Sequence, residues 1–342
     1  MRFTLFRCAL SILAIVAAPA LAAEEPILNL YSARHYQTDE ALYADFTKAT
    51  GIRINRIEAG DDQLLERLKS EGAGSPADVL LIVDAARLAQ ARDAGLFSPL
   101  HSTLLENRIP ATLRDPEGHW FGFSYRARVI VYNRMTVNPA DVASYDALGD
   151  PRNKGKVCTR SGSHPYNLSL VAAKLAHDGA AKTQSWANNV VANFARTPRG
   201  GDTDQIKAVA AGECAVALTN SYYYVRLLRS AKPEDREVVA KAGLVWPDQA
   251  GHGTHLNIAG GGVLKNAPHR GNAVRFLEYL ASDDAQAYFA NGNNEWPVVR
   301  SAARRNAELE SLGTFEADPL PVATLGRNTA EAQRIVDRAG WK

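Results

Sequence analysis

Tyrosines gather at three places in the chain, and each place follows a short apolar run. Tyr36 closes the segment SARHY (residues 32–36), Tyr166 follows SGSHP (161–165), and three tyrosines end TNSYYY (219–224). The preceding apolar runs are predicted strands, so we expect these tyrosines in loops at the carboxyl ends of strands, where open α/β sheets bind ligands. A lone tyrosine is more simply a packing residue. Three such places, one with the adjacent His35, favour a functional role.

Phenol side chains suit one kind of ligand in particular. A phenol has a pKa of about 10, so ionising it near neutral pH requires a strong local cation, and a hard trivalent metal supplies one. Three phenolates would cancel the charge of Fe³⁺, and a neutral imidazole would add none. The three tyrosine groups together with His35 therefore predict a ferric site.

The elements that must position these residues alternate between strand and helix in the first hundred residues. Predicted strands cover 27–31, 52–57 and 77–83, and predicted helices cover 38–46, 64–68 and 85–94, with Gly51 and Gly95 as stops. This βαβαβ order indicates an α/β sheet with helices on its faces.

The later part of the chain repeats this order after a long β-rich run, FGFSYRARVIVYN (121–133). A second series has strands at 156–158 and 213–218, each followed by a helix, and further extended segments at 244–247 and 253–257. Three glycines (260–262) are expected to break the regular structure before a helix at 273–281. Two βα modules flanking long strands suit a two-lobed protein whose chain crosses between the lobes more than once.

Composition and charge narrow the class of protein. The chain has 342 residues, 46% of them hydrophobic and 22% charged, with 39 Lys and Arg against 37 Asp and Glu. This length suggests two domains, and the balanced charge favours neither nucleic-acid binding nor disorder. Residues 1–22 read as a cleavable signal peptide, with Arg2 and Arg7 before an apolar stretch and a small-residue cleavage site at its end. We therefore expect an exported mature chain of zero formal charge.

Export changes the interpretation of the cysteines. Removing Cys8 with the signal peptide leaves Cys158 and Cys214, and an even number in an oxidising compartment favours a disulfide. Each precedes a tyrosine group, so a bridge would tie two of these groups together. Two separate buried thiols are the alternative.

Together, six segments make the chain resemble the ferric-ion-binding periplasmic proteins of iron ABC importers, in the branch that binds iron with a His-Tyr pair and three further tyrosines. They are LYSARHYQTDEALYADFTKATGI (30–52), SYRARVIVYN (124–133), GKVCTRSGSHPYNLSLVA (155–172), GECAVALTNSYYY (212–224), GHGTHLNIAGGGVLKNAP (251–268) and NNEWPVV (293–299).

The resemblance implies a ligand set, residue by residue. His35 and Tyr36 match the ligands of the first lobe, Tyr166 matches the tyrosine after the R-S-x-S loop, and Tyr222 and Tyr223 match the first tyrosines of the N-x-Y-Y motif. Tyr224 is then expected to support them. Four phenolates exceed the charge of Fe³⁺ by one, so either one is protonated or displaced, or a cation such as Arg34 or Arg126 compensates.

The family also implies a fold, partners and a candidate anion site. We expect a type II periplasmic binding protein, with residues 23–124 and 247–300 in the first lobe and 125–246 and 301–342 in the second. It would be a monomer that closes around Fe³⁺ and serves an inner-membrane ABC permease and its ATPase, with no nucleic-acid partner. Ser161, Gly162 and Ser163 stand where an anion such as carbonate binds in relatives, and Arg126 would support it.

Two other functions remain as alternatives to iron capture. A tyrosine-rich cleft of the same fold also suits organic cations such as polyamines or thiamine, for which Asp61 and Asp62 are the nearest acidic candidates. An exported metalloenzyme would need an open metal position and a general acid or base. Because no such group is evident and no H-E-x-x-H or G-x-S-x-G motif occurs, we expect a binding protein and not an enzyme.

Overall fold

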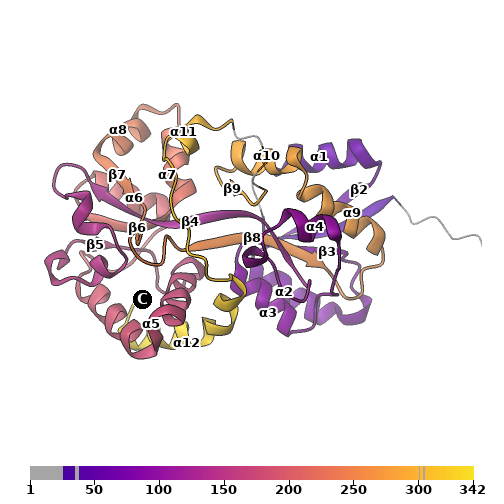
Figure 1. The fold of residues 1–342 in the computed structure, drawn as a ribbon, viewed down its shortest axis with the longest axis horizontal. Coiled ribbons are helices and arrows are strands. Elements are labelled where there is room, and N and C mark those ends of the chain that lie inside the picture. The colour runs from indigo at the N-terminus through magenta and orange to yellow at the C-terminus, as the bar shows by residue number, and fades with distance from the viewer. Residues whose placement is uncertain (1–25, 35–37, 300, 303–304) are drawn as a thin grey trace, which may run out of the picture.

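The computed structural model describes residues 26–34, 38–299, 301–302 and 305–342, so the predicted signal peptide lies outside the described residues. Two groups of helices and strands lie on either side of a pair of long strands, β4 (Phe121–Asn133) and β8 (Leu256–Val263) (Figure 1). This is the mixed α/β architecture that the alternating pattern predicts.

Most of the elements predicted with bounds begin and end within a few residues of those positions. The other strands are β1 (Ile27–Ser32), β2 (Arg53–Glu58), β3 (Val79–Ile82), β5 (Val157–Cys158), β6 (Val216–Asn220), β7 (Ala242–Val245) and β9 (Trp296–Pro297). The helices are α1 (Asp39–Thr50), α2 (Asp61–Glu71), α3 (Ala85–Asp93), α4 (Thr103–Arg108), α5 (Pro165–Ala192), α6 (Asp202–Ala210), α7 (Ser221–Leu228), α8 (Pro233–Lys241), α9 (Arg270–Leu280), α10 (Asp283–Asn291), α11 (Ala307–Glu310) and α12 (Ala323–Ala339).

The strands follow the order β2-β1-β3-β8-β4-β6-β5, with β7 and β9 also paired to β4. Strand β1 is parallel to β2 and β3, as expected for βαβ units, whereas β8 is antiparallel to both β3 and β4. All four residues of β3 are buried, which explains their uninterrupted VLLI sequence.

Strand β4 joins the two groups because it changes partners along its length. Its first half, through Ala127, pairs with β8, and its second half, from Arg128, pairs with β6 and β7. The side chains on both of its faces are buried, apart from the half-buried Tyr125. The candidate site therefore lies beside a strand that is paired with other strands along its whole length.

The C-terminal helix α12 lies against both α5 and α3 (Figure 1). It approaches α3 closely at Gly326, where an added Cβ would lie 2.1 Å from the Cβ of Ala89. The C-terminal tail thus bridges elements from both halves of the molecule.

The prediction for the three glycines at 260–262 is wrong. They do not break the chain but lie inside β8, between β3 and β4. A Cβ on Gly261 would lie 2.4 Å from the carbonyl oxygen of Leu80, and one on Gly262 would lie 2.1 Å from that of His119. These residues are glycines because neighbouring backbone comes too close for a side chain.

Among the described residues, no helix combines the length and the apolar character needed to cross a membrane.

Candidate metal centre

Tyrosines from two distant segments meet at one point. The phenol oxygens of Tyr166 and Tyr222 are 3.0 Å apart and share a hydrogen bond, and the rings of Tyr222 and Tyr223 have centroids 4.2 Å apart. The structure thus brings together the three predicted ligand tyrosines that lie within the described residues. His35 and Tyr36 lie outside the described residues.

We expected these tyrosines to lie in loops. They lie instead in the first turns of helices. Tyr166 is the second residue of α5 and Tyr222 the second residue of α7. The N-terminal end of a helix carries a partial positive charge, which favours an anion such as a phenolate. The starts of α5 and α7 therefore supply a partial positive charge near both residues.

His164 caps α5 and packs against Tyr166. Its Nδ1 accepts a hydrogen bond from the backbone N–H of Tyr166, and the two ring centroids are 4.5 Å apart. Burial, reinforced by nearby arginines, lowers the pKa of His164 to about 3. The imidazole is therefore neutral near pH 7 and adds no charge to the site.

Three guanidinium groups surround Tyr166. Their central carbons lie 5.5 Å (Arg126), 5.9 Å (Arg128) and 5.1 Å (Arg160) from the centroid of the Tyr166 ring. Burial raises the pKa of Tyr166 to about 12, while Arg126 and the hydrogen bond with Tyr222 act in the opposite direction. The metal-free phenol is therefore protonated at neutral pH, in a setting that already holds compensating cations.

A fourth arginine lies over the other two tyrosines. The guanidinium carbon of Arg226 is 5.9 Å from the Tyr222 ring centroid and 5.3 Å from that of Tyr223. Our sequence reasoning missed Arg128, Arg160 and Arg226. Two of them could have been found from their spacing, which places residues on the same face of an element. Arg128 lies two residues after Arg126 on one strand, and Arg226 lies four residues after Tyr222 on one helix.

Tyr224 faces away from this group. It is 3% exposed, and its hydroxyl donates to the carbonyl oxygen of Ala242 at 2.9 Å. Its phenol thus has a partner in the core beside β7, which suits a supporting role.

The candidate anion loop is tightly packed on one side. A Cβ on Gly162 would lie 2.5 Å from the carbonyl oxygen of Trp341, so this position has no room for a side chain. The hydroxyls of Ser161 and Ser163 are 2.9 Å apart, and the loop leads directly into the N-terminus of α5.

Arg34 is held by carboxylates. Its guanidinium makes two hydrogen bonds to Asp39, of 2.9 and 3.1 Å, and lies 3.6 Å from a carboxylate oxygen of Glu295. Arg34 is 3% exposed. Its two acidic neighbours therefore balance much of its charge.

The two acidic candidates for an organic-cation site differ in their surroundings. Asp62 forms an ion pair with Arg87 at 3.0 Å. Burial, together with the charge of Asp84, raises the pKa of Asp61 to about 6. Burial thus disfavours the charged form of Asp61, and Asp62 already has a cationic partner.

Cys158 and Cys214 form the predicted disulfide, with Cα atoms 5.8 Å apart. Cys158 ends β5, and Cys214 lies two residues before β6, the parallel neighbour of β5. The bridge joins the segments that lead to Tyr166 and Tyr222.

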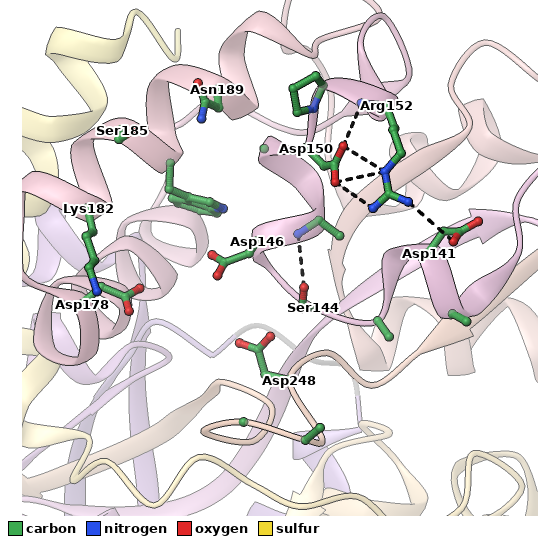
Figure 2. Close-up of a pocket in the computed structure, with 18 residues that line it drawn as sticks. Asp141, Ser144, Asp146, Asp150, Arg152, Asp178, Lys182, Ser185, Asn189 and Asp248 are labelled. Atoms are coloured by element: carbon green, nitrogen blue, oxygen red, sulfur yellow. Dashed lines mark hydrogen bonds and ion pairs between the residues drawn. The ribbon is translucent and has the colours of Figure 1, made fainter.

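A wide pocket of about 870 Å³ lies elsewhere, beside the second half of α5, and none of the predicted ligands lines it (Figure 2). Its acidic residues are largely engaged, as with Asp150 and Arg152 at 2.7 Å. Among the described residues, no group of three His, Cys, Asp or Glu side chains is arranged to hold a metal.

Comparison with known proteins gives consistent matches over nearly the whole chain. The family model described as "Bacterial extracellular solute-binding protein" matches residues 41–319. Iron uptake protein A2 of Synechocystis is 50% identical over 322 residues, which cover 94% of this chain and 91% of that protein. The structure of a Trichodesmium protein (IdiA, FutA) in complex with iron and citrate has a TM-score of 0.89 and 51% identity, over 92% of this chain and 100% of that one. Apo FutA2 from Synechocystis has a TM-score of 0.88 and 50% identity, over 93% and 99%.

Proposed function

Because the chain belongs to the bacterial extracellular solute-binding protein family, we propose that it captures Fe³⁺ in the periplasm and delivers it to an ABC permease. The observation that carries this proposal is the convergence of Tyr166 and Tyr222 at 3.0 Å, beside Tyr223 and under four arginines. Relatives at half identity are named for iron uptake, and one was solved with iron and citrate.

The proposed ligands are His35, Tyr36, Tyr166, Tyr222 and Tyr223. Each phenol loses its proton when it binds the metal, so capture releases protons. Four phenolates on Fe³⁺ would leave one negative charge. Arg126, Arg128 and Arg160 surround Tyr166, and Arg128 and Arg160 share the single carboxylate of Asp202, so this partner cancels only part of their charge. The remaining positive charge supports compensation of the extra phenolate without protonating a ligand.

A small anion is a further candidate ligand. The loop of Ser161, Gly162 and Ser163 precedes the N-terminus of α5, and Arg126 lies beside the Tyr166 ring. A helix N-terminus with a nearby guanidinium suits carbonate or a carboxylate. The citrate in the Trichodesmium complex supports an anion of this class.

Capture requires movement in this proposal. Residues 23–124 and 247–300 form one lobe, residues 125–246 and 301–342 the other, and β4 serves as a hinge strand between them. With His35 and Tyr36 on the first lobe and the other ligands on the second, Fe³⁺ would bridge the lobes and favour the closed state. The protein would work as an exported monomer without catalytic activity and would present the closed form to the permease.

An absorption titration with ferric citrate tests this function. We expect a phenolate-to-iron charge-transfer band in the visible range, with proton release as the band grows. A protein that stays colourless with one equivalent of ferric ion but binds spermidine would contradict the proposal and favour the organic-cation alternative.

A further inference from the structure

Arg128 makes polar contacts to residues beside both clustered ligand segments. This residue of β4 is 2% exposed. Its Nη2 donates to the side-chain oxygen of Asn167 at 2.6 Å, and its Nη1 donates to the side-chain oxygen of Asn220 at 3.0 Å. Asn167 directly follows Tyr166, and Asn220 is the N-cap residue of α7, two positions before Tyr222. One guanidinium group thus connects the starts of the two tyrosine-bearing helices.

Asp202 holds this guanidinium in place. Its Oδ2 accepts from Nη1 of Arg128 at 2.7 Å and also from the backbone N–H of Asn220 at 2.7 Å. Its Oδ1 lies 3.4 Å from Nη1 of Arg160. The side chain of Asp202 is fully buried, so these charged partners are what make its burial tolerable.

Asn167 extends the connection to the segment before α5. Its Nδ2 donates to the carbonyl oxygens of Arg160 and Ser161, both at 3.0 Å. The backbone on both sides of Tyr166 is therefore tied to Arg128 through one amide. The position of the Tyr166 phenol relative to that of Tyr222 depends on these contacts as well as on the disulfide further back.

We propose that Arg128, fixed by Asp202, is a positioning residue that sets the spacing of the Tyr166 and Tyr222 phenols for the metal. This inference rests on the proposed ferric function. The planar guanidinium reaches Asn167 with one nitrogen and Asn220 and Asp202 with the other, whereas a lysine ammonium is a single point. Residues that orient metal ligands typically contribute about 10–100-fold to metal affinity.

A purely structural ion pair would predict a different outcome. Removing Arg128 would then lower the thermal stability of the protein without a separate effect on the metal. A matched control exists in the other half of the molecule, where Arg92 of α3 bonds to the buried Asp115 at 3.0 Å and to Asp93 at 2.7 Å. The Arg92→Met variant removes a multiply bonded arginine on α3, a helix that carries none of the proposed ligands.

The experiment compares Arg128→Lys, Arg128→Met and Asp202→Asn with Arg92→Met, all as the full mature chain. Ferric affinity is measured by competition with citrate, alongside the thermal midpoint of the metal-free protein and the charge-transfer spectrum. We expect Arg128→Lys to lose about 10–100-fold in affinity and to shift the band. Arg92→Met should lower the thermal midpoint but keep the wild-type affinity and spectrum. Arg128→Lys keeps a cation beside the buried Asp202 and provides the folded variant if Arg128→Met or Asp202→Asn does not fold.

A double-mutant cycle tests whether Arg128 acts through the ligands. If it does, Arg128→Lys should cost little extra affinity once Tyr166→Phe has removed the phenol that it positions. Fully additive losses, or wild-type affinity and spectrum in Arg128→Lys, would overturn the inference.

A metal-free crystal structure of Arg128→Lys separates this inference from the proposed function. We expect the Tyr166 and Tyr222 oxygens to move beyond hydrogen-bonding distance in that variant. An unchanged 3.0 Å separation would overturn the positioning role even if the wild-type protein binds iron. A wild-type protein that binds no ferric ion would instead refute the proposed function.

Discussion

The phenol oxygen of Tyr166 lies 3.0 Å from that of Tyr222, although 56 residues separate the two in sequence. Two phenolates at this distance would repel each other strongly, so the phenols keep their protons while no metal is bound. A ferric ion removes that constraint because its charge displaces these protons and both oxygens can bind it. The hydrogen bond therefore marks the position where we expect the metal.

Replacing single tyrosines should separate ligands from supporting residues. Tyr222→Phe and Tyr223→Phe each delete an oxygen and keep the ring, so we expect ferric affinity to fall by more than about 100-fold, above the usual effect of residues that only orient ligands. Tyr224→Phe loses only a hydrogen bond to Ala242 and should cost about 1 kcal/mol of stability, with little change in affinity. Citrate competition and urea unfolding measure the two quantities. Equal affinity losses at all three positions would show that the assigned register is wrong.

Ferric binding should strengthen as the pH rises. Burial raises the pKa of Tyr166 to about 12, so its phenol is protonated in the metal-free protein and must lose that proton to bind. Apparent affinity should therefore increase about tenfold per pH unit for each proton released. The measurement is citrate competition between pH 6 and 8, corrected for the protonation of citrate. Tyr166→Phe is the control and should reduce the slope by one proton; an affinity independent of pH would contradict phenolate ligation.

Loss of the disulfide should destabilise the protein. The bond between Cys158 and Cys214 closes a loop with a sequence separation of 56, for which the chain-entropy model gives about 4 kcal/mol. We expect urea unfolding of the Cys158→Ala, Cys214→Ala double variant to show a loss of this order, and reduced wild-type protein to behave similarly. Peptide mapping of non-reduced, periplasmically produced protein checks the bond itself, and two free thiols there would refute it.

Asp61→Asn should stabilise the protein at neutral pH without affecting iron. The carboxyl is protonated in both folded and unfolded chains below its ordinary pKa of 3.8, so wild type and variant should then be similar. As pH rises, the unfolded chain ionises first, and the folded chain follows only near pH 6. Wild type should therefore lose on the order of 1 kcal/mol relative to the variant by pH 7.5. Unfolding at pH 3.5 and 7.5 checks this, and loss of ligand binding in the variant would favour the organic-cation site.

Metal binding should make the molecule more compact. If Tyr36 lies on one lobe and Tyr222 on the other, full coordination exists only in the closed state, and iron shifts the open–closed equilibrium by its differential affinity. Small-angle scattering should show the apo protein to be more extended than the loaded one. Tyr36→Phe should weaken closure, whereas Tyr222→Phe should weaken initial capture. Superimposable apo and loaded profiles would contradict the hinge proposal.

Much of the fold could be predicted from local patterns. Buried runs such as that of β3, and the helix stop at Gly51 with its positive φ of 75°, depend on nearby residues alone. The pairing of Cys158 with Cys214 was also predictable, because removal of Cys8 with the expected signal peptide would leave only two cysteines. The tyrosine groups could also be located from the sequence, because each follows a recognisable strand.

Local patterns failed where backbone or side chains from distant segments meet. Glycines 260–262 look like a turn in the sequence, but they lie within β8. They are glycines because the carbonyl oxygens of neighbouring backbone leave no room for a Cβ. The first turns of α5 and α7 were expected to be loops, although Pro165 at the first position of α5 and Asn220 at the N-cap of α7 are both helix-start signals.

The sequence by itself determined the chemistry of the site: which phenols, which cysteines and which strand-to-helix junctions are available. Only the tertiary structure decided that Tyr166 and Tyr222 touch and that Arg128 and Asp202 tie their helices together. The physical reason is that residue type and periodicity act over a few neighbours, whereas a buried ion pair forms only where packing brings opposite charges out of water at the same point.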